Sequence, residues 1–182
     1  AYKYSHHRFY GTEMTKMISY MESRGGKFEK TLFYGLQIIL KQYLEGIAIT
    51  KEEVDEAFDY LGTKYGVFGR EDVFDRSKFD YIVDKYDGRL PISIKAVPEG
   101  TVVDAKNVLF TIESLDENCA WLTNFLESIL LQVWYPSTVA TLSREVRKIV
   151  TESFLDCTSY DNKTINFLVD FVLNDFGFRG VS

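Results

Sequence analysis

Apolar residues return at helical spacing in the first half of the chain. Residues 1–28 show no periodicity and are predicted to be irregular, whereas between about 29 and 45 apolar side chains recur every three or four positions, which predicts a helix. Thr50 and Glu53 have the spacing of a capping box, in which a hydroxyl and a carboxylate satisfy free amides at the start of a helix. A third helix is expected after Ser77, and a glycine turn ends it. The apolar positions of these three helices are Leu32, Leu36, Ile39, Tyr43, Val54, Phe58, Leu61, Phe79, Ile82, Val83 and Tyr86.

The pattern changes to short alternating runs in the middle of the chain. Over residues 91–113, apolar and polar positions alternate, and turn-forming clusters at 98–100 and 104–107 interrupt them. This arrangement predicts three short antiparallel strands.

The last third is mostly helical in pattern. Residues 117–135 predict a helix that Pro136 is expected to break, and a second helix is predicted from about 138 to 155. The apolar run at 165–177 is interpreted as a strand buried on both faces. Helices, a small antiparallel sheet, further helices and one buried strand indicate an α+β domain that leads into an α/β one.

Composition narrows the class of protein. The chain has 182 residues, 46% of them hydrophobic, which suits one domain with a sizeable core, and its 14 Phe and 12 Tyr exclude disorder. A net charge of −6 argues against nucleic acid as a partner. Two cysteines, no signal peptide and no stretch of membrane-spanning length indicate a cytoplasmic protein without a membrane partner. The start at Ala1 and the end at Ser182, directly after an apolar run and a glycine turn, are typical of a piece of a longer protein.

Histidine and cysteine residues form no recognisable catalytic or metal site. His6 and His7 are adjacent, so we expect them to diverge rather than share a metal ion. Cys119 and Cys157 lack a partner at metal-binding spacing and are interpreted as small core residues. Spacing alone therefore assigns no catalytic residue and no metal ligand.

Two loops could bind a ligand. Residues 175–180 form a glycine turn after the expected buried strand, and Phe176 offers a ring face there while Arg179 can bind phosphate through two parallel hydrogen bonds. In α/β sheets, ligands bind at the carboxyl ends of strands. The second loop, 23–26, presents Arg24 beside two glycines. On spacing alone, an ordinary glycine turn is slightly favoured for residues 175–180, and a solvated arginine is the usual explanation for Arg24.

Several long, non-repetitive segments resemble the N-terminal part of the nicotinamide phosphoribosyltransferase family, over nearly all 182 residues. They are the Tyr2-Lys3 pair, LFYGLQ (32–37), most of 85–100, NVLFT (107–111), WLTN (121–124), most of 134–141, SRE (143–145) and DFG-x-RGVS (175–182).

The resemblance implies a type II phosphoribosyltransferase of NAD biosynthesis and salvage. Such an enzyme joins nicotinamide to phosphoribosyl pyrophosphate and releases nicotinamide mononucleotide and pyrophosphate, with Mg²⁺ on the phosphates. ATP hydrolysis is coupled in this family through residues that this chain lacks. The implied assembly is a homodimer with shared active sites, or this chain with a complementing C-terminal half. The implied fold is an N-terminal α+β domain at 1–167 and the first strand and turn of an α/β barrel at 168–182.

The family's site residues carry over to four positions. Tyr2 and Phe176 match the two aromatic residues that sandwich the pyridine ring, a favourable arrangement for an electron-poor ring. Arg24 and Arg179 match arginines that bind the substrate phosphates. Asn174 departs from the family, which often has His before the DFG motif. The residues that would separate nicotinamide from nicotinate as substrate have no match here, so that choice stays open.

Two alternatives remain beside the enzyme. The family's later barrel strands have no counterpart here, so we expect this chain to be inactive alone. A non-catalytic dimerisation or binding module that kept the family's N-terminal fold is the second hypothesis, although retention of all four site residues favours the enzyme. The strands around 94–113 also suggest half of a lipoyl or biotin carrier, but Lys95 and Lys106 do not sit at a suitable hairpin tip.

Overall fold

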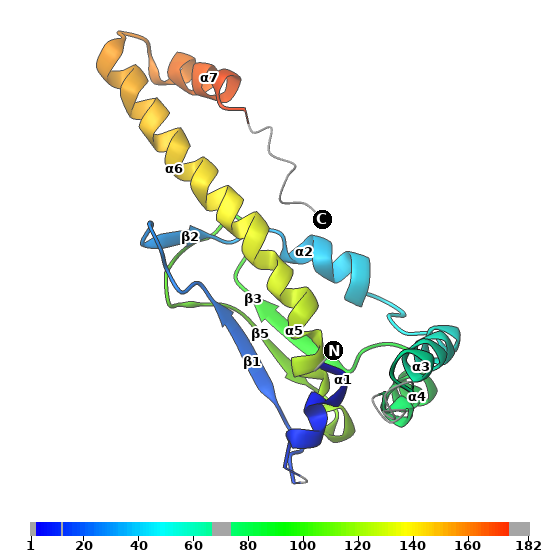
Figure 1. The fold of residues 1–182 in the computed structure, drawn as a ribbon. Coiled ribbons are helices and arrows are strands. Elements are labelled where there is room, and N and C mark those ends of the chain that lie inside the picture. The colour runs from blue at the N-terminus through cyan, green and yellow to red at the C-terminus, as the bar shows by residue number, and fades with distance from the viewer. Residues whose placement is uncertain (1–2, 12, 67–73, 175–182) are drawn as a thin grey trace. The chain divides into compact units, whose positions relative to one another are not determined.

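The computed structural model describes residues 3–11, 13–66 and 74–174, which form two compact units (Figure 1). Unit 1 comprises residues 1–22, 36–97 and 108–131, and unit 2 comprises residues 23–35, 98–107 and 132–182. The described elements are helices with small antiparallel sheets, which confirms the α+β class. The expected division at 167/168 stays a prediction.

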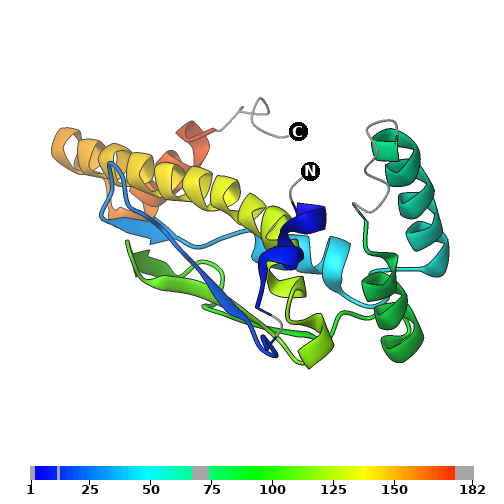
Figure 2. The ribbon, with the colours of Figure 1, turned by 60° about the horizontal axis from the view of Figure 1, so that its bottom comes forward.

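Unit 1 contains a three-stranded antiparallel sheet. Its strands are β1 (Ile18–Glu22), β3 (Ile92–Ala96) and β5 (Val108–Ser114), in the order β1-β5-β3. The middle strand buries Leu109, Phe110 and Ile112, and helix α5 (Leu122–Leu130) packs on the sheet with Leu122, Leu126 and Leu130 buried (Figure 2).

Two longer helices of unit 1 pack against each other, α3 (Lys51–Gly66) and α4 (Arg76–Tyr86). The capping box before α3 is confirmed, because the Thr50 N–H donates to Glu53 Oε2 over 2.8 Å and the Glu53 N–H donates to Thr50 Oγ1 over 3.3 Å. Helix α4 begins at Arg76, after Asp75, so the start expected after Ser77 is wrong by two residues.

The remaining described elements of unit 1 are short. They are α1 (Lys3–His6), the 3₁₀ turns at His7–Phe9 and Glu117–Cys119, and α2 (Leu36–Ile39), which continues as a π-helical turn at Leu40–Leu44. A further 3₁₀ turn, Leu131–Val133, follows α5 where the chain passes from unit 1 to unit 2.

Unit 2 is organised along the long helix α6 (Trp134–Cys157). The two-stranded sheet of β2 (Lys30–Leu32) and β4 (Val102–Asp104) contacts this helix, and α7 (Asn162–Val172) packs against it (Figures 1 and 2). Asp161 caps α7 by accepting hydrogen bonds from the Lys163 and Thr164 amides.

Several predicted elements differ from the structure. The helix expected at 29–45 starts only at Leu36, since β2 precedes it, and β1 lies in the region expected to be irregular. The three strands predicted within 91–113 are confirmed, but they belong to two sheets. Phe58, assigned to a buried face, is 40% exposed.

Two further corrections concern the C-terminal third. Pro136 does not break a helix but is the third residue of α6, where a backbone N–H has no intrahelical acceptor and proline is tolerated. The strand expected at 165–177 is wrong over residues 165–172, which are helical. Short apolar runs do not separate a strand from a buried helix, and here Ile165 and Val169 are buried at helical spacing.

Candidate functional site

Arg24 is the sequence-predicted site residue that falls within the described part of the chain. Tyr2, Phe176 and Arg179 lie outside the described residues, so their expected grouping with Arg24 stays a prediction. Arg24 is exposed on the loop between β1 and β2. Over the described residues, its guanidinium forms no ion pair or hydrogen bond with the protein and is available to a ligand.

Backbone contacts with the turn after β4 hold the Arg24 loop. The Lys106 N–H donates to the Ser23 carbonyl over 2.7 Å, and the Ala105 N–H donates to the Glu29 carbonyl over 2.8 Å. Gly25 adopts a left-handed φ of 85°, and a Cβ there would lie 3.5 Å from Ala105 Cβ. Both ends of the loop are thereby fixed, while Arg24 points its charge to solvent without a competing carboxylate.

The residue after Tyr2 is attached to α5. Lys3 Nζ donates to the Asn124 carbonyl over 2.8 Å and forms an ion pair with Glu127. In unit 2, the departure from the family at Asn174 has a local role, because its Nδ2 donates to the Phe171 carbonyl over 3.0 Å at the end of α7.

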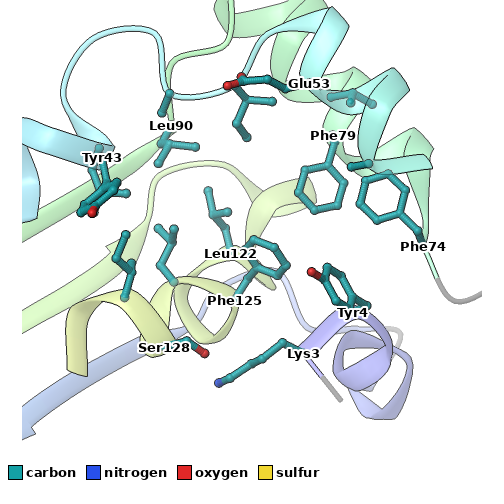
Figure 3. Close-up of a pocket in the computed structure, with 17 residues that line it drawn as sticks. Lys3, Tyr4, Tyr43, Glu53, Phe74, Phe79, Leu90, Leu122, Phe125 and Ser128 are labelled. Carbon is teal, nitrogen blue, oxygen red and sulfur yellow. The ribbon is translucent and has the colours of Figure 1, made fainter. Parts of the chain in front are cut away.

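An apolar groove of about 630 Å³ lies in unit 1 between α1, α3, α4 and α5 (Figure 3). Phe74, Phe79, Phe125 and Tyr4 form one end of the groove, and Tyr43 and Leu90 lie at the other. Helical spacing predicted that Phe79 lies on the apolar face of a helix and did not indicate the groove. Its walls come from elements distant in sequence, and no local pattern marks such a site.

A strongly polar cluster also lies in unit 1, around Asp116. Its Oδ2 accepts from Lys85 Nζ over 2.7 Å and from the hydroxyls of Tyr81 and Tyr86, while its Oδ1 accepts from the Asn118 N–H over 2.7 Å. The bond from Lys85 and then that from Tyr86 hold the pKa of the Asp116 carboxyl well below its usual range. The cluster joins α4 to the turn before α5 and is a structural contact.

The adjacent histidines have different partners, in agreement with the expectation that they diverge. His6 Nδ1 lies 3.4 Å from the Tyr10 hydroxyl, whereas His7 Nε2 lies 3.6 Å from Asp75 Oδ2. Burial, with a contribution from Lys78, lowers the pKa of His7. Across the described ranges, no three His, Cys, Asp or Glu side chains are placed to bind one metal ion.

Cys119 is buried at the start of the α5 region, as expected, but Cys157 is exposed at the end of α6, so its assignment to the core is wrong. Among the helices of the described residues, none has the length and apolar character needed to cross a membrane.

Known proteins match this chain over its whole length. A family model described as "Nicotinamide phosphoribosyltransferase, N-terminal domain" matches residues 1–94. The chain is 43% identical over 182 residues to the nicotinamide phosphoribosyltransferase of Xanthomonas campestris pv. campestris (strain 8004), covering 100% of this chain and 36% of that protein.

Two further relatives carry the same name. The Acinetobacter baylyi protein is 34% identical over 98 residues, which cover 52% of this chain and 18% of the relative. The Mycoplasma pneumoniae protein is 25% identical over 201 aligned positions, covering 100% of this chain and 43% of the relative. The chain thus spans less than half the length of these curated relatives. The chain belongs to the nicotinamide phosphoribosyltransferase family.

Proposed function

We propose that this chain supplies the N-terminal part of an enzyme that transfers a phosphoribosyl group to nicotinamide, forming nicotinamide mononucleotide and pyrophosphate. The 43% identity to a nicotinamide phosphoribosyltransferase across all 182 residues carries this proposal. The full activity requires the remaining family sequence, because this chain corresponds to 36% of that relative.

The proposed reaction requires the protein to orient the base and to stabilise charge. Transfer at the anomeric carbon of the ribose builds positive charge on the sugar while the C–O bond to pyrophosphate breaks and a bond to the pyridine nitrogen forms. The protein orients the base nitrogen opposite the leaving group and stabilises charge on the departing phosphates. Neither task needs a covalent nucleophile, which agrees with a site built from aromatic residues and arginines.

Arg24 suits the second task. Its guanidinium is exposed on a loop held at both ends and faces no carboxylate among the described residues, so its donors remain free for phosphate oxygens. Mg²⁺ carried by the substrate phosphates would neutralise further charge on the leaving group; we assign no residue of this chain to it. Tyr2 and Phe176 are proposed to stack on the pyridine ring, and Arg179 to share the phosphates with Arg24.

The proposed active site is shared between the two subunits of a homodimer. We propose that Tyr2 and Arg24 of one subunit complete the site formed by Phe176 and Arg179 of the other subunit. Activity then depends on association of two chains.

Steady-state kinetics of the full-length protein test the role of Arg24. We expect Arg24→Ala to raise the KM for phosphoribosyl pyrophosphate by about 10- to 100-fold, the loss of one or two charge-assisted hydrogen bonds, with little change in the KM for nicotinamide. Arg89→Ala is the matched control, because Arg89 is also exposed and its side chain makes no ion pair over the described residues. The two variants should differ in KM although both remove one positive charge.

The wild-type measurement decides between the two hypotheses for this family member. Formation of nicotinamide mononucleotide by the full-length protein supports the enzyme. A full-length protein that binds neither substrate and still dimerises would instead establish the non-catalytic module. An unchanged KM for phosphoribosyl pyrophosphate in Arg24→Ala would remove Arg24 from the phosphate site and leave the activity itself in place.

A further inference from the structure

The groove in unit 1 has the size of a small-molecule site. Its volume of about 630 Å³ lies within the range of about 300–1,000 Å³ that is usual for ligand pockets. Every residue that lines it belongs to unit 1, and together these residues come from α1, the 43–49 segment, α3, α4 with its flanking residues Phe74 and Leu90, and α5. The groove and the Arg24 loop belong to different units.

Aromatic rings form one end of this groove and already stack on one another. The Phe74 and Phe79 rings are stacked at 4.7 Å between centroids, and Phe125 meets Phe79 edge-to-face at 5.3 Å. Tyr4 extends this group, with its ring centroid 6.3 Å from that of Phe125 (Figure 3). Such an arrangement offers both ring faces and ring edges, which favours a planar aromatic ligand over an aliphatic chain.

The charged groups at the groove are held by protein partners. Lys3 is paired with Glu127 and bound to the Asn124 carbonyl, whereas the Glu53 carboxylate keeps its negative charge while it accepts hydrogen bonds from the backbone N–H and hydroxyl of Thr50. An anionic ligand would be repelled by the Glu53 charge and would also lose its own hydration. The groove therefore favours an uncharged ligand over an anion.

Three residues that line the groove carry hydroxyl groups without a hydrogen-bond partner among the described residues. Tyr4, Tyr43 and Ser128 line the groove, and over the described residues their hydroxyls make no hydrogen bond to the protein. Each can donate or accept one, so they suit a ligand with a few neutral polar atoms on an apolar ring system.

We propose that this groove is a second ligand site, which binds a neutral aromatic molecule of two or three rings through the Phe74–Phe79–Phe125–Tyr4 wall, with the three hydroxyls contacting its polar atoms. The proposal does not depend on the phosphoribosyl transfer proposed above.

Two fluorescent probes with one ring skeleton test it on the full-length protein. N-phenyl-1-naphthylamine is uncharged, and 8-anilino-1-naphthalenesulfonate adds a sulfonate to the same rings. We expect the neutral probe to bind at one site per chain with a Kd at least about tenfold lower than that of the sulfonate, a difference of about 1.4 kcal/mol.

Matched alanine variants locate the binding. Ala57 lies on α3 in the groove wall, and Ala140 lies on α6 outside it; both are helical and partly buried. Ala57→Phe fills the groove and should raise the Kd of the neutral probe about tenfold, whereas Ala140→Phe should leave it within twofold. Because Ala57→Phe could also disturb folding, the combined Tyr4→Phe and Ser128→Ala variant provides a milder test. It should weaken the neutral probe while leaving the far-ultraviolet circular dichroism unchanged.

Three results would overturn the proposal. The first is that the full-length protein shows no saturable binding of the neutral probe, which would mean that another part of the chain covers the groove. The second is that the sulfonate binds as tightly as the neutral probe or more tightly. The third is that the Ala57→Phe variant folds and still binds the neutral probe with the wild-type Kd.

Discussion

Asp116 shows how one carboxylate fixes two segments of unit 1. Its side chain is only 6% exposed, and four donors surround it, from Lys85, Tyr86, Tyr81 and the Asn118 amide. A buried charge is stabilising only when its hydrogen bonds are complete, and this carboxylate meets that condition.

Replacing Asp116 by Asn should therefore destabilise the protein. The amide keeps the shape but loses the negative charge that Lys85 and the two tyrosines share, so we expect the free energy of unfolding to fall by about 1–3 kcal/mol. Urea unfolding followed by tryptophan fluorescence measures this. Asp104→Asn is the control, since its ion pair with Lys30 is exposed on both sides, and it should change stability by less than about 0.5 kcal/mol.

The same substitution has a pH signature. Because the folded-state pKa of Asp116 lies below its ordinary value of about 3.9, the carboxylate stabilises the fold at neutral pH, and that contribution is lost as the pH falls through and below this value. The wild type should thus lose more stability between pH 5 and 3 than Asp116→Asn does. Parallel acid profiles would argue against a buried, fully paired carboxylate.

At the scale of elements, the contact between the β2 end and α6 depends on a glycine. Gly35 has a φ of 100°, and a Cβ at this position would lie 2.4 Å from Cγ of Pro136, within the first turn of α6. Neighbouring contacts reinforce the junction, because the Tyr34 N–H donates to Ser137 Oγ and the Leu32 N–H donates to Thr141 Oγ1.

Gly35→Ala should consequently destabilise unit 2 by about 2–4 kcal/mol, the combined cost of a left-handed backbone and a steric overlap. Gly100→Ala is the control in the same unit. Its φ of 87° carries the backbone cost, but nothing lies within 4 Å of the added methyl group, so about 1 kcal/mol is expected. Thermal unfolding compares the two, and equal losses would mean that the Pro136 contact yields without cost.

These junctions also explain what the sequence could and could not predict. The α3 cap is local, with Thr50 and Glu53 three residues apart, and its prediction is confirmed. Strand β2 depends instead on partners about 70 and 110 residues away, Asp104 and Thr141, which no window of the sequence contains. The periodic run from 29 to 45 therefore predicted one helix, whereas distant hydrogen bonds hold its first residues in β2 and the helix begins only at Leu36.

Of the two candidate ligand sites, one could be predicted from the sequence and the other could not. Arg24 could be selected from the sequence because a family motif and a glycine loop mark it, and the structure adds that it is exposed and unpaired over the described residues. The apolar groove could not be predicted, because Phe74, Phe79 and Phe125 have no special spacing and become neighbours only in the folded chain.

For the whole molecule, we expect the purified 182-residue chain to form no nicotinamide mononucleotide. Unit 2 leaves large apolar side chains exposed on α6 and α7, a surface suited to packing against further protein. These side chains are Leu142, Ile149, Leu155, Phe167, Phe171 and Val172. The full-length protein in the same assay is the control, and product formation by the short chain above the enzyme-free background would refute this expectation.

The order of strands in unit 1 has a consequence for synthesis on the ribosome. Ile18 of β1 pairs with Glu113 of β5, which follows it by 95 residues, and among the described strands β3 pairs with β5 alone. At a translation rate of about 5–20 residues per second, β5 is synthesised about 5–20 seconds after β1, so β1 lacks its hydrogen-bond partner for that time. Throughout that interval the nascent chain carries an unpaired strand with Ile18 and Tyr20, so we expect its yield in the cell to rise when chaperones shield this segment until the sheet can close.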